Sequence, residues 1–288
     1  SNTAYKTPPI AASTGSGTIG AGSSVFGDVL YTPRSVDLLG LPFQTSDGRS
    51  VYYRSGNDIQ NPLWTVHNAK TTQDTERIFG NFRFNYKLND NLALAYQLGL
   101  DTYTEFGSYG QNKGGVDGNQ TGIYRTTQSK NKIWNHNLTL NYNKDLNEDL
   151  NLQFIVGGQS RRDVFQRDGV ESTQQLAFGV LEHYNFVNHT TVNSFSNNPI
   201  AFLSEENQVG LYADATLGYK GALFLNFAAR NDWTSTLETD NFSIFYPAAS
   251  ISFVPTDFFD SISNNDTLSY LKLRLGYGTS AGFPAPYG

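Results

Sequence analysis

The feature that most constrains this sequence is an alternation of apolar and polar residues, repeated in long runs between residues 75 and 277. In the first run Phe82 and Phe84 fall on one face of an extended chain, whereas Arg83 and Asn85 fall on the other. The runs last about ten residues or more, which is enough for a tilted strand to cross a bilayer. A soluble β-sandwich alternates in shorter runs. The pattern therefore predicts an all-β fold, an antiparallel segment of a transmembrane β-barrel whose polar face lines a lumen.

The lengths of the connections give this segment a direction. The eight predicted strands span residues 76–88, 92–106, 132–146, 150–162, 206–219, 223–233, 242–254 and 268–278. Counting the region before the first strand, the first six connections alternate between long loops, such as 107–130, and tight turns, such as Lys220–Ala222, and the last two are of moderate length. Outer-membrane barrels place tight turns on the periplasmic side and long loops outside. We therefore expect the long loops, including 163–204, to be extracellular.

Two regions follow from the periodicity. Residues 1–74 lack it and are predicted to be a long extracellular loop region with a flexible Gly/Ser/Thr tract at 11–24. Residues 75–288 carry the strands and loops of the barrel, with a short helix at 174–184 and a helical turn within 255–267. No signal peptide is visible and the sequence contains no Met, so we expect an internal piece of a longer protein.

Composition and motifs argue against several other classes of protein. No run reaches about 18 consecutive apolar residues, so no transmembrane helix is predicted. The net charge of −6 without a basic run makes nucleic acid an unexpected partner, and the absence of Cys removes thiolate metal sites. A GxGxxG match at 15–20 has no strand before it, and the four histidines lack the spacing of metal ligands. Adjacent carboxylates such as Glu205 and Glu206 point to opposite faces of a strand. We expect no enzyme, no cofactor and no metal.

Several stretches also resemble a known family when taken in order. They are Pro33–Leu38, Asn61–Trp64, Ala229–Leu237, Phe245–Phe253 and Leu268–Gly278. Over residues 31–288 they resemble the SusC/RagA family of TonB-dependent outer-membrane transporters. The resemblance implies a barrel of about 22 strands with an N-terminal plug, of which this chain supplies about eight strands and no plug. It also implies energy from TonB, a SusD-like surface lipoprotein as a lid, and the outer membrane of a bacterium of the Bacteroidetes type.

Two sets of side chains are candidates for contact with a ligand or another part of the protein. Rings in the long loops can stack on sugars, and their polar neighbours can bind sugars or peptides. The loop set is Trp64, Tyr109, Tyr124, Arg125, Tyr184 and Asn185. Charges on the polar face would sit in a wet lumen, away from lipid. The lumen set is Arg83, Asp101, Arg161, Asp214, Arg230, Asp232, Lys272 and Arg274.

Each set has an alternative role. The loop residues can simply pack the loops against a lid lipoprotein, and we interpret the lumen residues as a wall that docks the plug. The resulting hypothesis is part of a SusC-like importer, mainly for oligosaccharides, working with a SusD-like lipoprotein. A peptide importer of the RagA type, an outer-membrane receptor or assembly component, and a soluble secreted β-sandwich or adhesin stay open as alternatives. Recovery in the soluble fraction without detergent would eliminate the membrane assignment.

Overall fold

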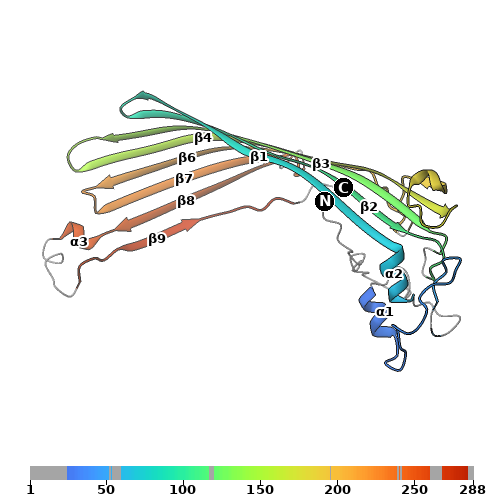
Figure 1. Cartoon of the computed structure of the whole chain (residues 1–288). Helices are drawn as coiled ribbons and strands as arrows, with labels where there is room; N and C mark the ends of the chain where they lie inside the picture. The colour runs from blue at the N-terminus through green and yellow to red at the C-terminus, as the bar shows by residue number, and fades with distance from the viewer. Residues whose placement is uncertain are drawn as a thin grey trace. The chain divides into compact units, whose positions relative to one another are not determined.

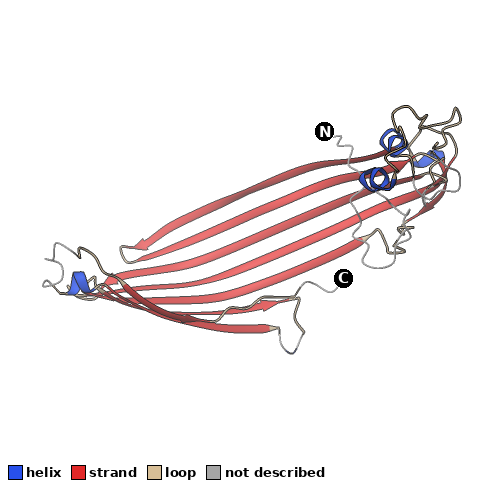
Figure 2. Cartoon of the chain, turned by 90° about the horizontal axis from the view of Figure 1, so that it is seen from below, coloured by secondary structure: helices blue, strands red, loops and turns tan. Residues whose placement is uncertain are grey.

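The structure, a computed structural model, describes residues 25–51, 53, 60–116, 120–194, 196–238, 240, 242–259 and 268–284. Its strands form one antiparallel sheet (Figure 1), drawn in red in Figure 2. The strands are β1 (Ala69–Asn89), β2 (Leu92–Gln111), β3 (Ile123–Asp145), β4 (Leu150–Gln175), β5 (Phe186–Thr190), β6 (Phe202–Tyr219), β7 (Leu223–Thr234), β8 (Ser243–Phe253) and β9 (Leu273–Gly278). They lie in the order β1-β2-β3-β4-β6-β7-β8-β9, and β5 pairs with β4. The Gly/Ser/Thr tract at 11–24 and the GxGxxG match at 15–20 fall outside the described residues.

The predicted all-β, antiparallel fold is confirmed, and all eight predicted strands are present. The described strands form a single sheet, whereas a β-sandwich requires two sheets packed face to face. The predicted tight turn after Tyr219 is also present. There Lys220 has φ +52° and Gly221 has φ +65°, the left-handed conformation that short hairpin turns require.

The predicted helix at 174–184 is wrong. The strand β4 continues to Gln175, a short 3-10 helix, η1, covers only His183–Asn185, and β5 returns along β4. The register pairs Glu171 with Thr190 and Gln175 with Phe186. The backbone hydrogen bonds at the end of β4 are therefore made to β5, across a hairpin. Local helix propensity contains no information about this pairing. The helical turn expected within 255–267 is present as α3 (Pro255–Phe258).

The cross-strand register places the two kinds of side chain on opposite faces. On one face Leu217 pairs with Leu225, Leu225 with Ile251 and Ile251 with Leu275. Many residues of this face are exposed: Phe227 is 62% and Leu275 is 75% exposed. Such a continuous exposed apolar face is stable in hydrocarbon rather than in water.

The described chain divides into two compact units. The first is Ser1–Arg77, Tyr103–Lys130 and Gln166–Leu203, and the second is Ile78–Thr102, Asn131–Phe165 and Ser204–Gly288. The first unit therefore begins with the predicted loop region and adds β5 and the loop-side ends of β1, β2, β3, β4 and β6. The second contains the sheet with alternating faces.

The first unit has its own small core and two short helices, α1 (Val25–Tyr31) and α2 (Pro62–Asn68). Asn61 caps α2 by accepting a hydrogen bond from the Leu63 backbone N–H at 2.9 Å, and Pro62 occupies the first turn, where a missing N–H costs nothing. Trp64, Ile123, Phe186 and Ile200 are buried. None of the described helices is long and apolar enough to span a membrane.

Candidate functional site

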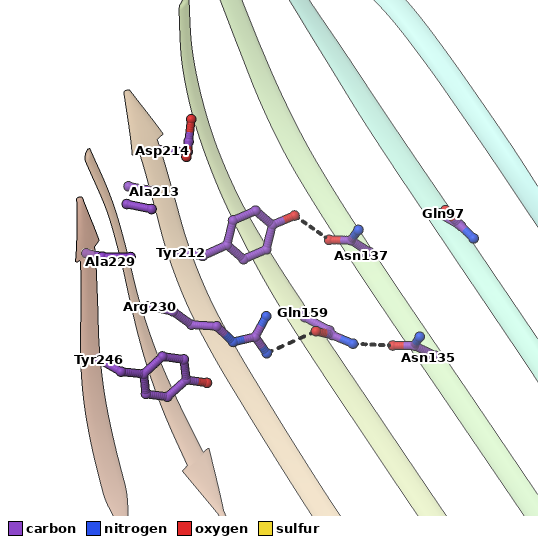
Figure 3. Close-up of a pocket in the computed structure, with 12 residues that line it drawn as sticks. Gln97, Asn135, Asn137, Gln159, Tyr212, Ala213, Asp214, Ala229, Arg230 and Tyr246 are labelled. Atoms are coloured by element: carbon purple, nitrogen blue, oxygen red, sulfur yellow. Dashed lines mark hydrogen bonds between the residues drawn. The ribbon is translucent and has the colours of Figure 1, made fainter. Parts of the chain in front are cut away.

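The polar face of the second unit holds a pocket of about 460 Å³ (Figure 3). It is lined by Gln97, Asn135, Asn137, Gln159, Tyr212, Ala213, Asp214, Ala228, Ala229, Arg230, Tyr246 and Ala248. The alternation that defines the strands brings these polar groups together, because the register pairs Tyr212 with Arg230 and Arg230 with Tyr246. Cross-strand partners share a face, so side chains from distant parts of the sequence meet on one surface.

An ion pair holds Arg230, one of the residues that line this pocket. The Arg230 Nε–H donates to both carboxylate oxygens of Asp232, at 2.8 and 3.0 Å, and the Tyr246 hydroxyl donates to Asp232 as well. Asp232 is only 2% exposed, and these hydrogen bonds offset the free-energy cost of burying its carboxylate. Gly210 lies opposite Asp232 in the register. Because it has no side chain, it leaves space for the Asp232 carboxylate, which a Cβ at this position would overlap. The arrangement holds the guanidinium in one orientation.

Hydrogen bonds continue from the ion pair across the sheet. The Arg230 Nη2–H donates to Gln159 Oε1 at 3.0 Å, and Gln159 Nε2 donates to Asn135 Oδ1 at 3.2 Å. In parallel, the Tyr212 hydroxyl donates to Asn137 Oδ1 at 2.8 Å. Figure 3 shows these three bonds as dashed lines leading from the β7 and β6 side toward β3. These hydrogen bonds hold side chains from β3, β4, β6 and β7 in place.

The lumen set is distributed along the sheet. Asp214 and Arg230 line the pocket, and Asp232 accepts hydrogen bonds from Arg230, so the structure brings these three together. Arg83 donates to Gln97 Oε1 at 2.8 Å, and Arg161 pairs with Asp163 at 3.0 Å. The remaining members lie outside this cluster. Asp101 lies on β2, Lys272 immediately precedes β9, and Arg274 pairs with Ser252 on the same face as Arg230.

Sequence reasoning missed most of the neutral members of the pocket. Its amide and phenol groups were visible as polar positions of the alternation, but only charged residues were selected. Whether two such positions meet depends on strand register, which the alternation alone leaves open within steps of two residues. The missed residues are Gln97, Asn135, Asn137, Gln159, Tyr212 and Tyr246.

In the first unit, two members of the loop set belong to the interior. Trp64 is fully buried, and its indole N–H donates to the Gly48 carbonyl at 2.9 Å. Asn185 is 7% exposed, and its amide bonds the backbone of Ala177 and Val180. Ordinary loop packing therefore accounts for these two side chains, and neither ring face nor amide is turned to solvent.

The other members of the loop set lie closer to the surface. Tyr184 is 78% exposed, whereas Tyr109 is half-buried and donates weakly to Gln111 at 3.4 Å. The Arg125 Nε–H donates to Glu171 at 2.6 Å, which neutralises a fully buried carboxylate. The structure thus presents Tyr184 to solvent and commits Arg125 to an ion pair.

Two histidines next to Tyr124 form a hydrogen-bonded chain that the sequence did not predict. The fully buried Ser172 hydroxyl lies 2.7 Å from Nδ1 of both His183 and His189, and Thr126 Oγ1 lies 2.8 Å from His183 Nε2. The ring of Tyr124 packs on His183 at 4.8 Å between centroids. Burial, and then the nearby His189, lower the pKa of His183. Among the described residues, no group of three or more His, Cys, Asp or Glu could hold a metal ion.

Comparison with known proteins identifies the same kind of fold, a β-barrel. Residues 21–288 match the family described as TonB dependent receptor-like, beta-barrel. The fold is similar to a chain of the RagAB peptide transporter, with a TM-score of 0.68, 17% identity, and coverage of 79% of this chain and 25% of that chain. For the RagAB peptide importer in its "open-open" state the TM-score is 0.64 and the identity 20%, with the same coverage of 79% and 25%. The chain therefore spans about a quarter of these solved chains, and no curated protein matches it.

Proposed function

Because the chain belongs to the family of TonB-dependent receptor-like β-barrels, which lie in the outer membrane, we propose that it forms part of the wall and extracellular vestibule of an importer. The observation that carries the proposal is the two-faced sheet, with exposed apolar rungs such as Leu225–Ile251 on one side and a hydrogen-bonded polar pocket on the other. The first face suits lipid, and the second suits a hydrated lumen.

The importer would be of the SusC type, with TonB supplying energy and a SusD-like lipoprotein closing the extracellular mouth. Oligosaccharides would be its main substrates. The work of this segment would be non-covalent: to enclose the ligand, to hold a plug against the polar face, and to release that plug when TonB pulls. The ion pair of Arg230 with the buried Asp232 supports a docking role, since it makes the polar face rigid.

A peptide importer is a second candidate, supported by the likeness to a chain of the RagAB peptide transporter. At 17% identity this likeness shows the fold alone, so substrate must be tested directly. Growth and uptake of labelled compounds, with oligosaccharides in one arm and peptides in the other, would separate the two candidates. A receptor or assembly role would leave both arms unaffected by loss of the gene.

The experiment begins with the full-length protein in its native outer membrane. Deletion of its gene is expected to abolish uptake of one labelled nutrient class, and a protonophore is expected to do the same in the wild type. Restoration by the wild-type gene is the control. Uptake that persists in both cases would refute the importer, and recovery of the protein in the soluble fraction would refute the membrane location.

A further inference from the structure

The loops of the first unit form another pocket, of about 780 Å³, which contains none of the residues of the loop set or the lumen set. Its described lining comes from three stretches of the same unit: 47–50, 113–116 with 120–121, and 174–175. Backbone hydrogen bonds join these stretches, since the Ser50 N–H donates to the Gly114 carbonyl and the Gln175 N–H to the Thr121 carbonyl, both at 2.8 Å. The pocket is therefore part of the folded loops, and its size is typical of sites for small ligands.

The lining of this loop pocket carries a net positive charge. Arg49 Nε lies 2.9 Å from the carboxylate of Asp47, but the two terminal nitrogens of Arg49 bond no described residue. Lys113 Nζ donates to the Leu176 carbonyl at 2.7 Å, which positions the ammonium, and no ion pair within the described residues neutralises it. The two cations lie on adjacent stretches, because a Cβ on Gly114 would lie 3.0 Å from Arg49 Cα. Two cations and one carboxylate therefore attract an anion.

Two neutral side chains of the lining also lack partners within the described part of the chain. The Ser50 hydroxyl is buried without a hydrogen bond, which is unfavourable unless a ligand supplies one. The Gln174 amide bonds no described residue, and Gln174 has φ +64°, a conformation that is uncommon for residues other than glycine. Both groups can donate and accept hydrogen bonds, so the pocket requires a ligand that does the same.

These groups distinguish between chemical classes of ligand. None of the described lining residues is aromatic, so the rings on which a neutral sugar can stack are missing there. Val116 is the one large apolar side chain among them, which leaves little surface for the apolar side chains of a peptide. A carboxylate accepts parallel hydrogen bonds from a guanidinium, and sugar hydroxyls both donate and accept. A sugar that carries a carboxylate meets both requirements.

We propose that the loop pocket binds an acidic oligosaccharide, with a uronate carboxylate accepting from Arg49 and Lys113 and sugar hydroxyls bonded to Ser50 and Gln174. The inference rests on the proposed function, and it narrows the nutrient from oligosaccharides in general to those that carry uronic acids. Because the long loops are expected to be extracellular, the ligand would meet this pocket before it enters the lumen.

The test is a binding measurement by isothermal titration calorimetry on the purified full-length protein, with three probes of equal length. They are tetragalacturonate, its methyl ester and tetraglutamate. The methyl ester keeps the sugars and removes the charges, whereas tetraglutamate keeps the carboxylates on a peptide. Tetragalacturonate is expected to bind at least about tenfold more tightly than either, because it alone combines charge-assisted bonds with sugar hydroxyls. Equal or tighter binding of either other probe, or no binding of tetragalacturonate, would overturn the proposal.

Three substitutions then test the contacts. Arg49→Gln and Lys113→Gln are each expected to weaken the binding of tetragalacturonate about tenfold, as expected for loss of a charge-assisted bond. Ser50→Ala is expected to weaken it about threefold and to leave folding intact, because this hydroxyl bonds nothing in the described chain. Lys130→Gln, at an exposed cation of the same unit outside the pocket, is the matched control and is expected to change nothing.

The variants keep the proposal open to refutation even if one of them does not fold. Ser50→Ala decides the question if a charge variant is unstable, and unchanged affinity in Ser50→Ala or in Arg49→Gln would overturn the proposal. The outcomes also separate this inference from the importer itself. Gene-dependent uptake of a neutral glycan or a peptide, without binding of tetragalacturonate, would overturn the inference and retain the importer. Conversely, binding of tetragalacturonate by a protein whose deletion affects no uptake would retain the site and refute the importer.

Discussion

Two neighbouring glycines of β4 provide a sharp test of the packing on the polar face. Gly157 is buried against the Tyr212 ring, and a Cβ there would lie 2.5 Å from the hydroxyl oxygen and 2.8 Å from Cε2. Gly158 faces the other way, where a Cβ would lie 3.3 Å from a terminal methyl of Leu211. The same substitution therefore meets a fixed ring at one position and a flexible aliphatic side chain at the next.

The magnitude follows from these contacts. Gly157→Ala must displace the ring and strain its 2.8 Å bond to Asn137, and overpacking of this kind costs about 1–3 kcal/mol. Ala restricts the unfolded chain more than Gly does, and this effect alone raises the free energy of unfolding by about 0.5–1 kcal/mol at either position. We expect Gly157→Ala to lower the free energy of unfolding by about 1–2 kcal/mol. Gly158→Ala should leave it unchanged or raise it slightly.

The assay is urea-induced unfolding of the full-length protein in lipid vesicles, followed by tryptophan fluorescence and by electrophoretic mobility without heating. Adding Tyr212→Leu to Gly157→Ala removes the ring and is expected to recover much of the lost stability, because the added methyl then has room. Equal unfolding free energies for Gly157→Ala and Gly158→Ala, within about 0.5 kcal/mol, would refute the packing argument.

Three further predictions concern charge, lipid and pH. In a double-mutant cycle, Arg230→Gln and Asp232→Asn should couple by about 2–3 kcal/mol in unfolding free energy, because each leaves the other's charge without its partner; independent effects would contradict this. Phe227→Lys on the apolar face should destabilise the folded protein in vesicles by about 2–4 kcal/mol, whereas Ser250→Lys on the polar face should not. The pKa of His183 is lowered in the folded loop, so the unfolded loop takes up a proton first as pH falls below the ordinary value of 6.5. Loop stability, measured by hydrogen exchange, should be greatest above that pH and fall below it, and His183→Gln should abolish the dependence.

The strands were predictable because a period of two residues is a local property of the sequence. Each of Phe82 and Arg83 reveals its face without knowledge of any partner, and the eight predicted runs all became strands. The end of β4 was not predictable in this way. Residues 163–175 alternate less clearly, since outside the lipid-facing part of a strand nothing requires one side to be apolar.

The candidate sites depend more on contacts between residues far apart in sequence. Trp64 resembled a stacking platform, yet its indole meets the Gly48 carbonyl 16 residues away and closes the core of the loops. The bonds of Gln159 with Asn135 and of Tyr212 with Asn137 join positions 24 and 75 residues apart. Such pairs are set by register and by side-chain reach, which no single stretch of sequence contains.

The strand order has a consequence for how such a wall is assembled. From β1 to β4 and again from β6 to β9, each strand is hydrogen-bonded to the strand that follows it in the chain, and β5 is a detour folded back on β4. Tight turns join β1 to β2, β3 to β4 and β6 to β7, so little loop entropy opposes each pairing. The sheet can form one hairpin at a time, because each new hairpin pairs with the edge strand of the sheet that has already formed. Gain or loss of one hairpin then changes the circumference without re-pairing the strands already in place.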